Sequence, residues 1–293
     1  MPEPGDLLVT SRQYKLGAFR CQITSDDPQL SQLIDRFLVP FRPKIRGSDN
    51  DRAYSLATVS RETVSLIADG DQLLLTGPPM DAVEYLLWEV SQQGINSVTD
   101  SLALHAGSLC WRGHGIVLPA PSGSGKSTLV AGLTAAGFGY LSDEVALLDL
   151  ESGTLHPFPR ALWMSRQSID LVPGLRERLP VGPGDPERLE RHVPPDSLRP
   201  DAVGKGCPLR CVIVPEHVAD GKTVLDPIRR SEAVVSMMTN AFNFKKFGGP
   251  GLVALAGIAD RIEAYRLRMA DLSGAVDLVL EAIAKLSDDS ASR

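Results

Sequence analysis

The sequence has no block of lysine or arginine, and acidic residues outnumber basic ones. Of 293 residues, 36 are Asp or Glu and 30 are Lys or Arg, which gives a formal net charge of -6 at pH 7. A nucleic-acid-binding protein normally needs a concentrated basic face that neutralises phosphates. The composition therefore argues against a nucleic-acid partner.

Long hydrophobic runs are also lacking. No stretch approaches the roughly 20 apolar residues that cross a bilayer, and the segment from Met1 to Asp6 is polar, without the apolar core of a signal peptide. We therefore expect a cytoplasmic protein with no membrane partner. Hydrophobic residues still make up 43% of the chain, which is enough to build an ordinary globular core.

Cysteine is scarce as well. The chain has four cysteines, Cys21, Cys110, Cys207 and Cys211. The last two are spaced C-x-x-x-C, with neither a second cysteine pair nor a histidine doublet, so the spacing argues against a zinc site. Thiols stay reduced in the cytosol, and we expect these four to be buried and inert.

The length of the chain favours two domains. Residues 1–100 are predicted to form a small α+β domain, with an Asp69-Gly70 turn that is typical of a β-hairpin. Its strands are expected at 16–24, 54–59, 63–68 and 72–76, and its helices at 29–37 and 78–93.

Residues 101–293 alternate strand-like and helix-like segments, which predicts an α/β domain with a mixed, strongly twisted sheet. Strands are expected at 102–111, 116–118, 140–142, 145–149, 154–158, 209–214, 224–228, 252–259 and 262–269, and helices at 127–136, 231–242 and 273–286. Prolines and glycines crowd between 173 and 208, which predicts a long loop, either a solvated connector or a lid over a site.

The segment from Ala120 to Thr128 reads A-P-S-G-S-G-K-S-T and matches the Walker A pattern, with alanine in place of the first glycine. A predicted strand precedes it and a predicted helix follows. Gly123 and Gly125 allow backbone N–H groups to turn toward one anion. Lys126 would bind the terminal phosphates of ATP, and the Ser127 hydroxyl would ligate Mg²⁺. The predicted cofactor-binding residues are Ser122, Gly123, Ser124, Gly125, Lys126, Ser127 and Thr128.

Asp143 and Glu144 are the candidates for acid–base chemistry. They follow a short predicted strand, at the kind of strand end where open α/β sheets gather ligands. Neighbouring residues of an extended chain point in opposite directions, so one acid could face a metal and the other an acceptor. The alternative is that both lie in an ordinary surface turn.

Three short motifs together resemble the catalytic core of bacterial HPr kinase/phosphorylase. They are H-A-G-S-L from His105, P-S-G-S-G-K-S from Pro121, and A-G-F from Ala136 leading into L-S-D-E from Leu141. Glu144 stands where that family has a second aspartate, so the chain is more similar to divergent HPr-kinase-related proteins. The S-G-x-G-K-S form is shared with PEP carboxykinases. The resemblance therefore implies a P-loop-containing, HPr kinase/PEP carboxykinase-like domain over residues 101–293.

The resemblance also implies roles for individual residues. Asp143 would act as the base, Lys126 and Ser127 would hold phosphates and magnesium, Glu144 would assist the metal, and His105 would lie beside the phosphates. The expected function is a Mg-ATP-dependent kinase that phosphorylates a serine-type hydroxyl of a protein or peptide. A small-molecule kinase and a nucleotide-dependent sensor without phosphotransfer remain as alternatives. A homo-oligomer is a further possibility that the resemblance raises.

Other polar residues are weaker candidates. Arg160 and Lys205 could reach phosphates from loops, but surface exposure is the default for both residue types. The segment 243–249 could contact a substrate, or it could simply connect a helix to a strand.

Overall fold

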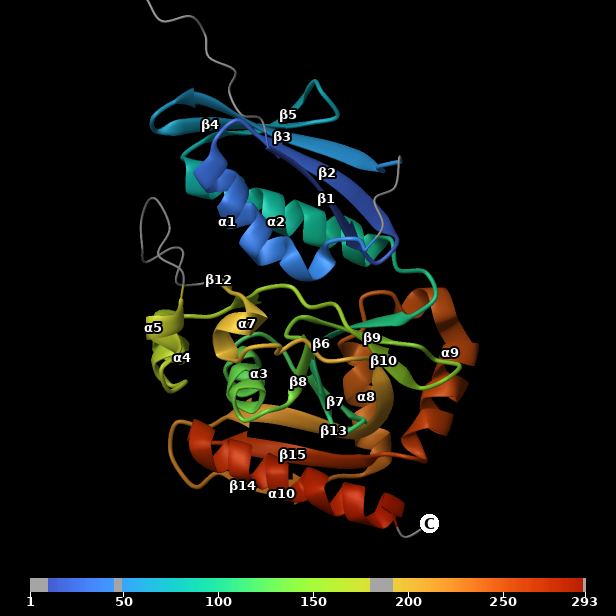
Figure 1. The fold of residues 1–293 in the computed structure, drawn as a ribbon. Coiled ribbons are helices and arrows are strands. Elements are labelled where there is room, and N and C mark those ends of the chain that lie inside the picture. Colours follow the sequence, from blue (N-terminus) through green and yellow to red (C-terminus); the bar gives the residue numbers. More distant parts are fainter. Residues whose placement is uncertain (1–9, 45–48, 180–191, 292–293) are drawn as a thin grey trace, which may run out of the picture. The chain divides into compact units, whose positions relative to one another are not determined.

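The computed structural model describes residues 10–44, 49–179 and 192–291. The fold is mixed α/β, and the described residues form two compact units, one over residues 10–98 and one over residues 99–291. Each unit has its own sheet (Figure 1). Within these ranges no helix is both long and apolar enough to cross a membrane.

The first unit is a five-stranded sheet in the order β1-β2-β3-β4-β5, with two helices on one face (Figure 1). The pair β2–β3 is parallel and the other pairs are antiparallel. Its elements are β1 (Thr10–Leu16), β2 (Phe19–Ser25), α1 (Pro28–Leu38), the 3-10 helix η1 (Val39–Phe41), β3 (Arg52–Ser60), β4 (Thr63–Ala68), β5 (Gln72–Gly77) and α2 (Pro79–Asn96).

The prediction of one strand over 16–24 is wrong, because the chain reverses within it. Leu16 ends β1 and pairs with Phe19 at the start of β2. Gly17 lies between them with φ +61°, a backbone conformation that glycine adopts without steric cost. A Cβ at this position would also lie 2.9 Å from Oγ of Ser97. The two apolar runs on either side of Gly17 read as a single strand only because the turn between them is so short.

A buried carboxylate fastens α1 to the sheet of the first unit. Asp35 is 8% exposed and accepts hydrogen bonds from the hydroxyl of Tyr14 at 2.9 Å and Nε of Arg42 at 2.8 Å. The guanidinium of Arg12 forms an ion pair with the same carboxylate. Burial acts to raise the pKa of Asp35, but the hydrogen bonds from Arg12, Arg42 and Tyr14 outweigh it, so the pKa is lowered.

Asp35→Asn is therefore expected to destabilise the first unit by about 2 kcal/mol at pH 7. Because the pKa of Asp35 is lower in the folded protein than in the unfolded chain, where it is about 3.9, the ionised carboxylate stabilises the fold above that pH. This stabilisation is lost as the pH falls through the pKa of the folded state. The difference between wild type and variant should thus shrink below about pH 4. Urea-dependent hydrogen exchange of the α1 amides measures the difference in free energy of unfolding, with Glu62→Gln in an exposed turn as the control. The same difference between wild type and Asp35→Asn at pH 7 and at pH 3 would contradict this role of Asp35.

The second unit contains a mixed, eight-stranded sheet in the order β10-β9-β6-β7-β13-β15-β14, with β8 paired to β6 and β10 also paired to β13. Strands β7, β13 and β15 are parallel to one another. The strands of this sheet are β6 (Leu102–Trp111), β7 (His114–Pro119), β8 (Gly139–Ser142), β9 (Val145–Leu148), β10 (Thr154–His156), β13 (Cys207–His217), β14 (Val224–Pro227) and β15 (Glu263–Met269). A separate pair is β11 (Leu162–Trp163) and β12 (His192–Val193).

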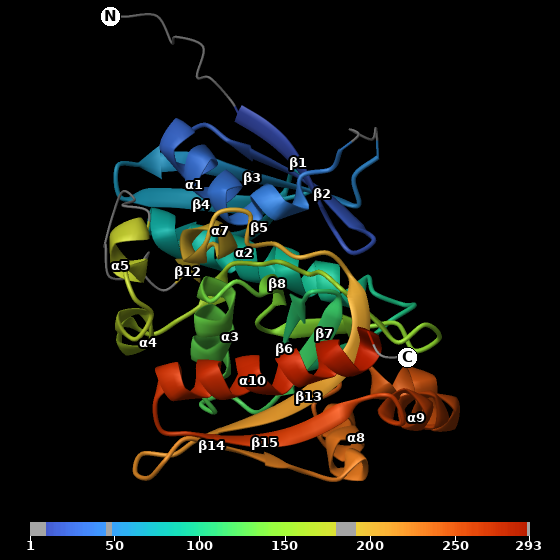
Figure 2. The same cartoon turned by 60° about the horizontal axis from the view of Figure 1, so that its bottom comes forward.

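Helices cover both faces of this sheet, because alternate residues of its strands face opposite cores. Ile116 and Leu118 of β7 pack in a core with α3 and α10, which lie side by side (Figure 2). Val117 and Val212 pack in a second core with α8 and α9. The helices of the unit are α3 (Lys126–Ala135), α4 (Arg166–Asp170), α5 (Leu175–Arg178), α7 (Pro195–Leu198), α8 (Arg230–Thr239), α9 (Phe244–Ala259) and α10 (Leu272–Ala291).

The strand predicted over 252–259 is wrong, because this segment is the second half of α9. The buried residues of α9 are Gly251, Leu255 and Ala259, which recur every four residues along one face. Val253 lies on the other side and is 74% exposed. A short, continuous apolar run does not distinguish a strand from a helix by its periodicity, and here the helix is formed.

The long loop predicted over 173–208 lies partly outside the described residues, which omit 180–191. The remainder contains α5, β12 and α7. Leu175, Val193 and Leu198 are buried in the core that also holds α3. The parts of the segment that are described are therefore packed structure rather than a solvated connector, and their apolar residues are too widely spaced to show a period.

Candidate functional site

The phosphate-loop sequence joins the carboxyl end of β7 to the start of α3. The parallel neighbours β13 and β15 end nearby, at His217 and Met269. A Cβ built on Gly125 would collide with Cε of Met269 and would lie 3.9 Å from Cβ of His217. Parallel strands thus bring their carboxyl ends to the loop, the edge at which α/β sheets bind ligands.

The backbone of the loop has the conformation that an anion nest requires. Gly123 and Gly125 have φ values of +85° and +82°, which turn successive N–H groups toward one side. Gly125 is also the N-cap of α3, and within the described chain no side chain caps this helix. Its first N–H groups and the positive end of its dipole are therefore directed at the same point.

Ser124 supplies an independent sign that the loop fits an anion. Its hydroxyl oxygen is buried and has no hydrogen-bond partner among the described residues. A buried hydroxyl without a partner costs about 1–3 kcal/mol, and a bound phosphate oxygen would remove that cost. The loop residues Ser122 to Thr128 thus fit the phosphates of a nucleotide.

Lys126 is buried at the first position of α3, with 7% exposure. Its Nζ lies 2.9 Å from Nε2 of His105 and donates to the carbonyl oxygen of Ala120 at 3.3 Å. Burial lowers its pKa, and the charges of Glu144 and Asp143 oppose that shift. A buried ammonium whose hydrogen-bond partners in the described part of the chain are neutral is well placed to attract an anionic ligand.

Asp143 is 2% exposed and faces the start of α3. Its Oδ2 accepts a hydrogen bond from Oγ of Ser127 at 3.3 Å, and its Oδ1 accepts one from the hydroxyl of Tyr140 at 3.2 Å. Burial raises its pKa, while Arg160 acts to lower it. A carboxyl group with a raised pKa is a better proton acceptor than an ordinary surface carboxylate.

The carboxylate of Glu144 lies near two basic groups. It lies 3.7 Å from Nδ1 of His105 and 3.7 Å from Nη1 of Arg160. Burial lowers the pKa of His105, and the charge of Lys126 lowers it further. The structure therefore brings His105, Lys126, Ser127 and the two acids together around one loop.

Arg160 had two interpretations from the sequence, a surface charge or a loop residue that reaches phosphates. Its side chain is 20% exposed and lies 3.7 Å from the carboxylate of Glu144. Tyr140 was not assigned a role from the sequence. Tyr140 is fully buried, and its hydroxyl, which has a single proton to donate, lies between two acceptors, the carbonyl oxygen of Arg160 at 2.7 Å and Oδ1 of Asp143 at 3.2 Å. Only the position of Tyr140, three residues before Asp143 on a short strand, could have indicated it.

The oxygen atoms near the loop also fit a magnesium ion that is bound together with phosphates. In the described residues, no group of three or more His, Cys, Asp or Glu side chains is arranged to hold a metal by itself. Magnesium prefers oxygen ligands and takes only one or two from protein when phosphates supply others. The hydroxyl of Ser127 beside the carboxylate of Asp143 meets that need. Glu144 is the other carboxylate close to the loop.

Comparison with known proteins gives limited information. No family model matches the sequence, and no curated protein matches it. Among solved structures, the Hpr(Ser) kinase/phosphatase from Coxiella burnetii aligns with 14% identity over 65% of this chain and 99% of that chain, with a TM-score of 0.33. A superposition with so low a TM-score carries no inference about activity.

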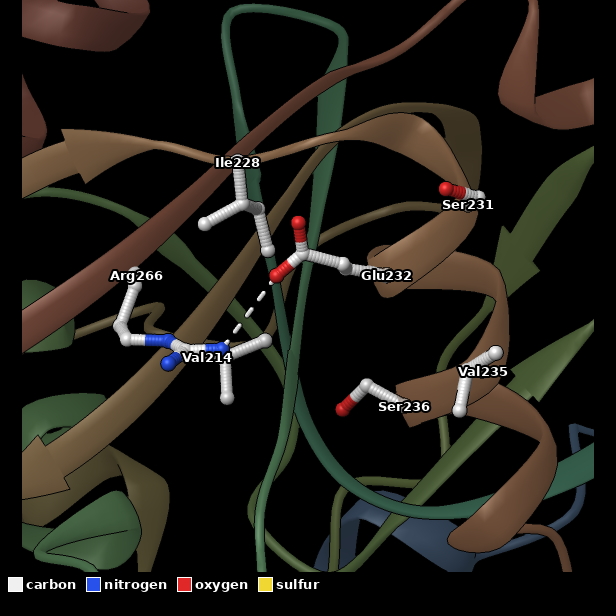
Figure 3. A pocket seen from close by; sticks show the side chains of 7 residues that line it. All are labelled: Val214, Ile228, Ser231, Glu232, Val235, Ser236 and Arg266. Carbon is white, nitrogen blue, oxygen red and sulfur yellow. Dashed lines mark ion pairs between the residues drawn. The ribbon is translucent and has the colours of Figure 1, made fainter.

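A different hollow lies on the face of the sheet covered by α8 (Figure 3). Glu232 and Arg266 form an ion pair across it at 3.5 Å. The ion pair already satisfies the charged groups of the hollow, so its chemistry is less suited to a reaction than that of the loop. It is lined by Val214, Ile228, Ser231, Glu232, Val235, Ser236 and Arg266.

Gly123→Ala is expected to test the loop conformation directly. A Cβ at Gly123 meets nothing within 4 Å, so the substitution acts through its positive φ, which costs a non-glycine residue about 1–2 kcal/mol. The amides should rotate to relieve this strain and ATP binding should weaken about tenfold or more. Gly70→Ala is the matched control, with φ +90° and equally open surroundings. Titration with ATP should show a lowered affinity for Gly123→Ala and a wild-type affinity for Gly70→Ala. Equal ATP affinities of the two variants would contradict an anion nest at this loop.

Proposed function

We propose that this chain is a Mg-ATP-dependent kinase that transfers the terminal phosphate of ATP to a hydroxyl group. The observation that carries this proposal is the convergence at one loop of the buried ammonium of Lys126 and the buried carboxylate of Asp143. Phosphoryl transfer requires charge neutralisation, in-line positioning and a group that accepts the proton of the acceptor, and these residues can supply each of them.

The roles follow from the surroundings of each residue. The amides of the loop and Lys126 would bind the phosphates, and the burial of Lys126 strengthens this attraction because water screens it less. Asp143 would accept the proton as the acceptor oxygen bonds to the terminal phosphorus and the bond to the bridging oxygen of ADP breaks. Magnesium bound near Ser127, assisted by Glu144, would neutralise charge on the phosphates.

His105 and Arg160 would act by holding neighbouring groups. His105 contacts Lys126 through Nε2 and lies near Glu144 through Nδ1. Arg160 lies near Glu144, and its backbone carbonyl accepts from the Tyr140 hydroxyl that also contacts Asp143. These contacts would keep Lys126 and Asp143 in fixed positions before ATP arrives, which lowers the entropic cost of transfer.

Incubation with γ-labelled ATP and hydroxyl acceptors tests this function. The acceptors are serine peptides and free serine, and wild type should transfer label in a magnesium-dependent manner. A protein that binds ATP saturably but leaves all label on the nucleotide would instead be a nucleotide-dependent sensor, and the kinase proposal would be wrong.

A further inference from the structure

The loop between α8 and α9 is bound along β6 just before His105. The backbone N–H of His105 donates to the carbonyl oxygen of Asn240 at 2.6 Å, and that of Phe242 donates to Ala103 at 2.9 Å. The side-chain oxygen of Asn243 accepts from the N–H of Ala103 at 2.9 Å. Together with the isolated antiparallel bridge between Leu104 and Ala241, these bonds hold the backbone of the loop against β6.

Phe242 is the exposed aromatic residue that this loop presents. Its ring is 53% exposed and packs edge-on against the ring of His105, with centroids 5.7 Å apart and planes at 78°. Single exposed apolar side chains are common on protein surfaces. This one differs because its backbone is held against β6 and because His105, its ring partner, contacts Lys126 at 2.9 Å.

The contacts of His105 connect Phe242 to the residues of the proposed reaction. His105 packs against Phe242, lies 2.9 Å from Nζ of Lys126 and lies 3.7 Å from the carboxylate of Glu144. In the proposed function Lys126 binds the terminal phosphates and the neighbouring Asp143 accepts the proton of the acceptor. A side chain packed on His105 is therefore close to the place where the acceptor would meet the terminal phosphate.

Resting on the proposed function, we propose that Phe242 determines acceptor specificity by packing against an apolar side chain next to the phosphorylated hydroxyl. The acceptor is then a segment of a peptide or protein. Free serine has no second side chain that could cover the ring, because its only side chain carries the reacting hydroxyl. Aromatic anchors at rigid positions contribute most where an apolar partner covers them.

Transfer from γ-labelled ATP to a serine peptide library, randomised at the positions flanking serine, tests this inference. Wild type should prefer aliphatic or aromatic residues beside the serine. Phe242→Ser should lose this preference, with kcat/KM for apolar-flanked peptides reduced about tenfold and the KM for ATP unchanged. Phe242→Leu should keep most of the preference. Val253→Ser, at an exposed apolar position of α9, should behave like wild type.

The other outcomes separate this inference from the proposed function. Three results would overturn the role of Phe242 and leave the kinase proposal standing. The first is equal labelling of all serine peptides by wild type, and the second is an undiminished sequence preference in Phe242→Ser. The third is transfer to free serine at the rate of the best peptide. A raised KM for ATP in Phe242→Ser assigns the ring to the nucleotide and also overturns that role. Saturable ATP binding without any labelled acceptor overturns the proposed function and this inference with it.

Discussion

Lys126→Met is expected to weaken Mg-ATP binding by at least about 100-fold, which corresponds to about 3 kcal/mol. Methionine keeps an unbranched side chain of similar length in the buried position, and it removes the charge together with the contacts to His105 and Ala120. The bound phosphates would lose the ammonium at a place where water screens the attraction poorly. Isothermal titration of both proteins with Mg-ATP measures the change.

The stability of the same variant provides the control. In the unliganded protein, Lys126 is 7% exposed, and its hydrogen-bond partners within the described residues are the neutral acceptors His105 and Ala120. Removing a buried charge of this kind is often neutral or stabilising. We therefore expect the unliganded variant to melt at the same temperature as wild type or higher. A strongly lowered melting temperature would mean that Lys126 stabilises the folded protein. An unchanged affinity for ATP would mean that Lys126 does not bind the phosphates.

Asp143→Asn is expected to reduce phosphotransfer by about 100- to 10,000-fold, the usual contribution of a general base. Asparagine is nearly isosteric, and its oxygen can still accept a hydrogen bond from Tyr140 or Ser127. ATP affinity should therefore change little. Single-turnover transfer from labelled ATP gives the rate, and titration with ATP gives the affinity.

Glu144→Gln is the matched control for that experiment. Its side chain is 38% exposed and points toward His105 and Arg160. If Glu144 assists the metal, transfer should persist in the variant but require more magnesium. If Asp143→Asn transfers phosphate at the wild-type rate, Asp143 is not the base. If, in addition, Glu144→Gln is inactive, Glu144 is the base and Asp143 is the residue that assists the metal.

Local sequence signals predicted much of the fold. β7, the turn with Gly123 and Gly125 at positive φ, and α3 are all specified within a short stretch by glycines and an apolar pattern. The Asp69-Gly70 turn is likewise formed, with both residues at positive φ. The errors fall where a local signal is ambiguous, as at the tight turn of Gly17 and in the apolar run over 252–259.

Contacts between distant segments could not be predicted from the sequence. Phe242 meets His105 across more than a hundred residues of chain, and nothing in the loop sequence indicates that pairing. The inward position of Arg160 depends on where the Tyr140 hydroxyl binds its carbonyl. Local motifs in the sequence indicate candidate residues individually. The burial of these residues and their contacts with one another depend on tertiary packing.

The central claim is that the backbone amides of Gly123 and Gly125, with Lys126, form a binding site for a polyphosphate. Titration of ¹⁵N-labelled protein with pyrophosphate, followed through its amide signals, tests this most directly. The amides of these three residues should shift saturably, while those of Gly70 and Gly113, glycines in tight turns with equally positive φ, stay unchanged. Saturating pyrophosphate that leaves the loop amides unmoved would contradict the claim.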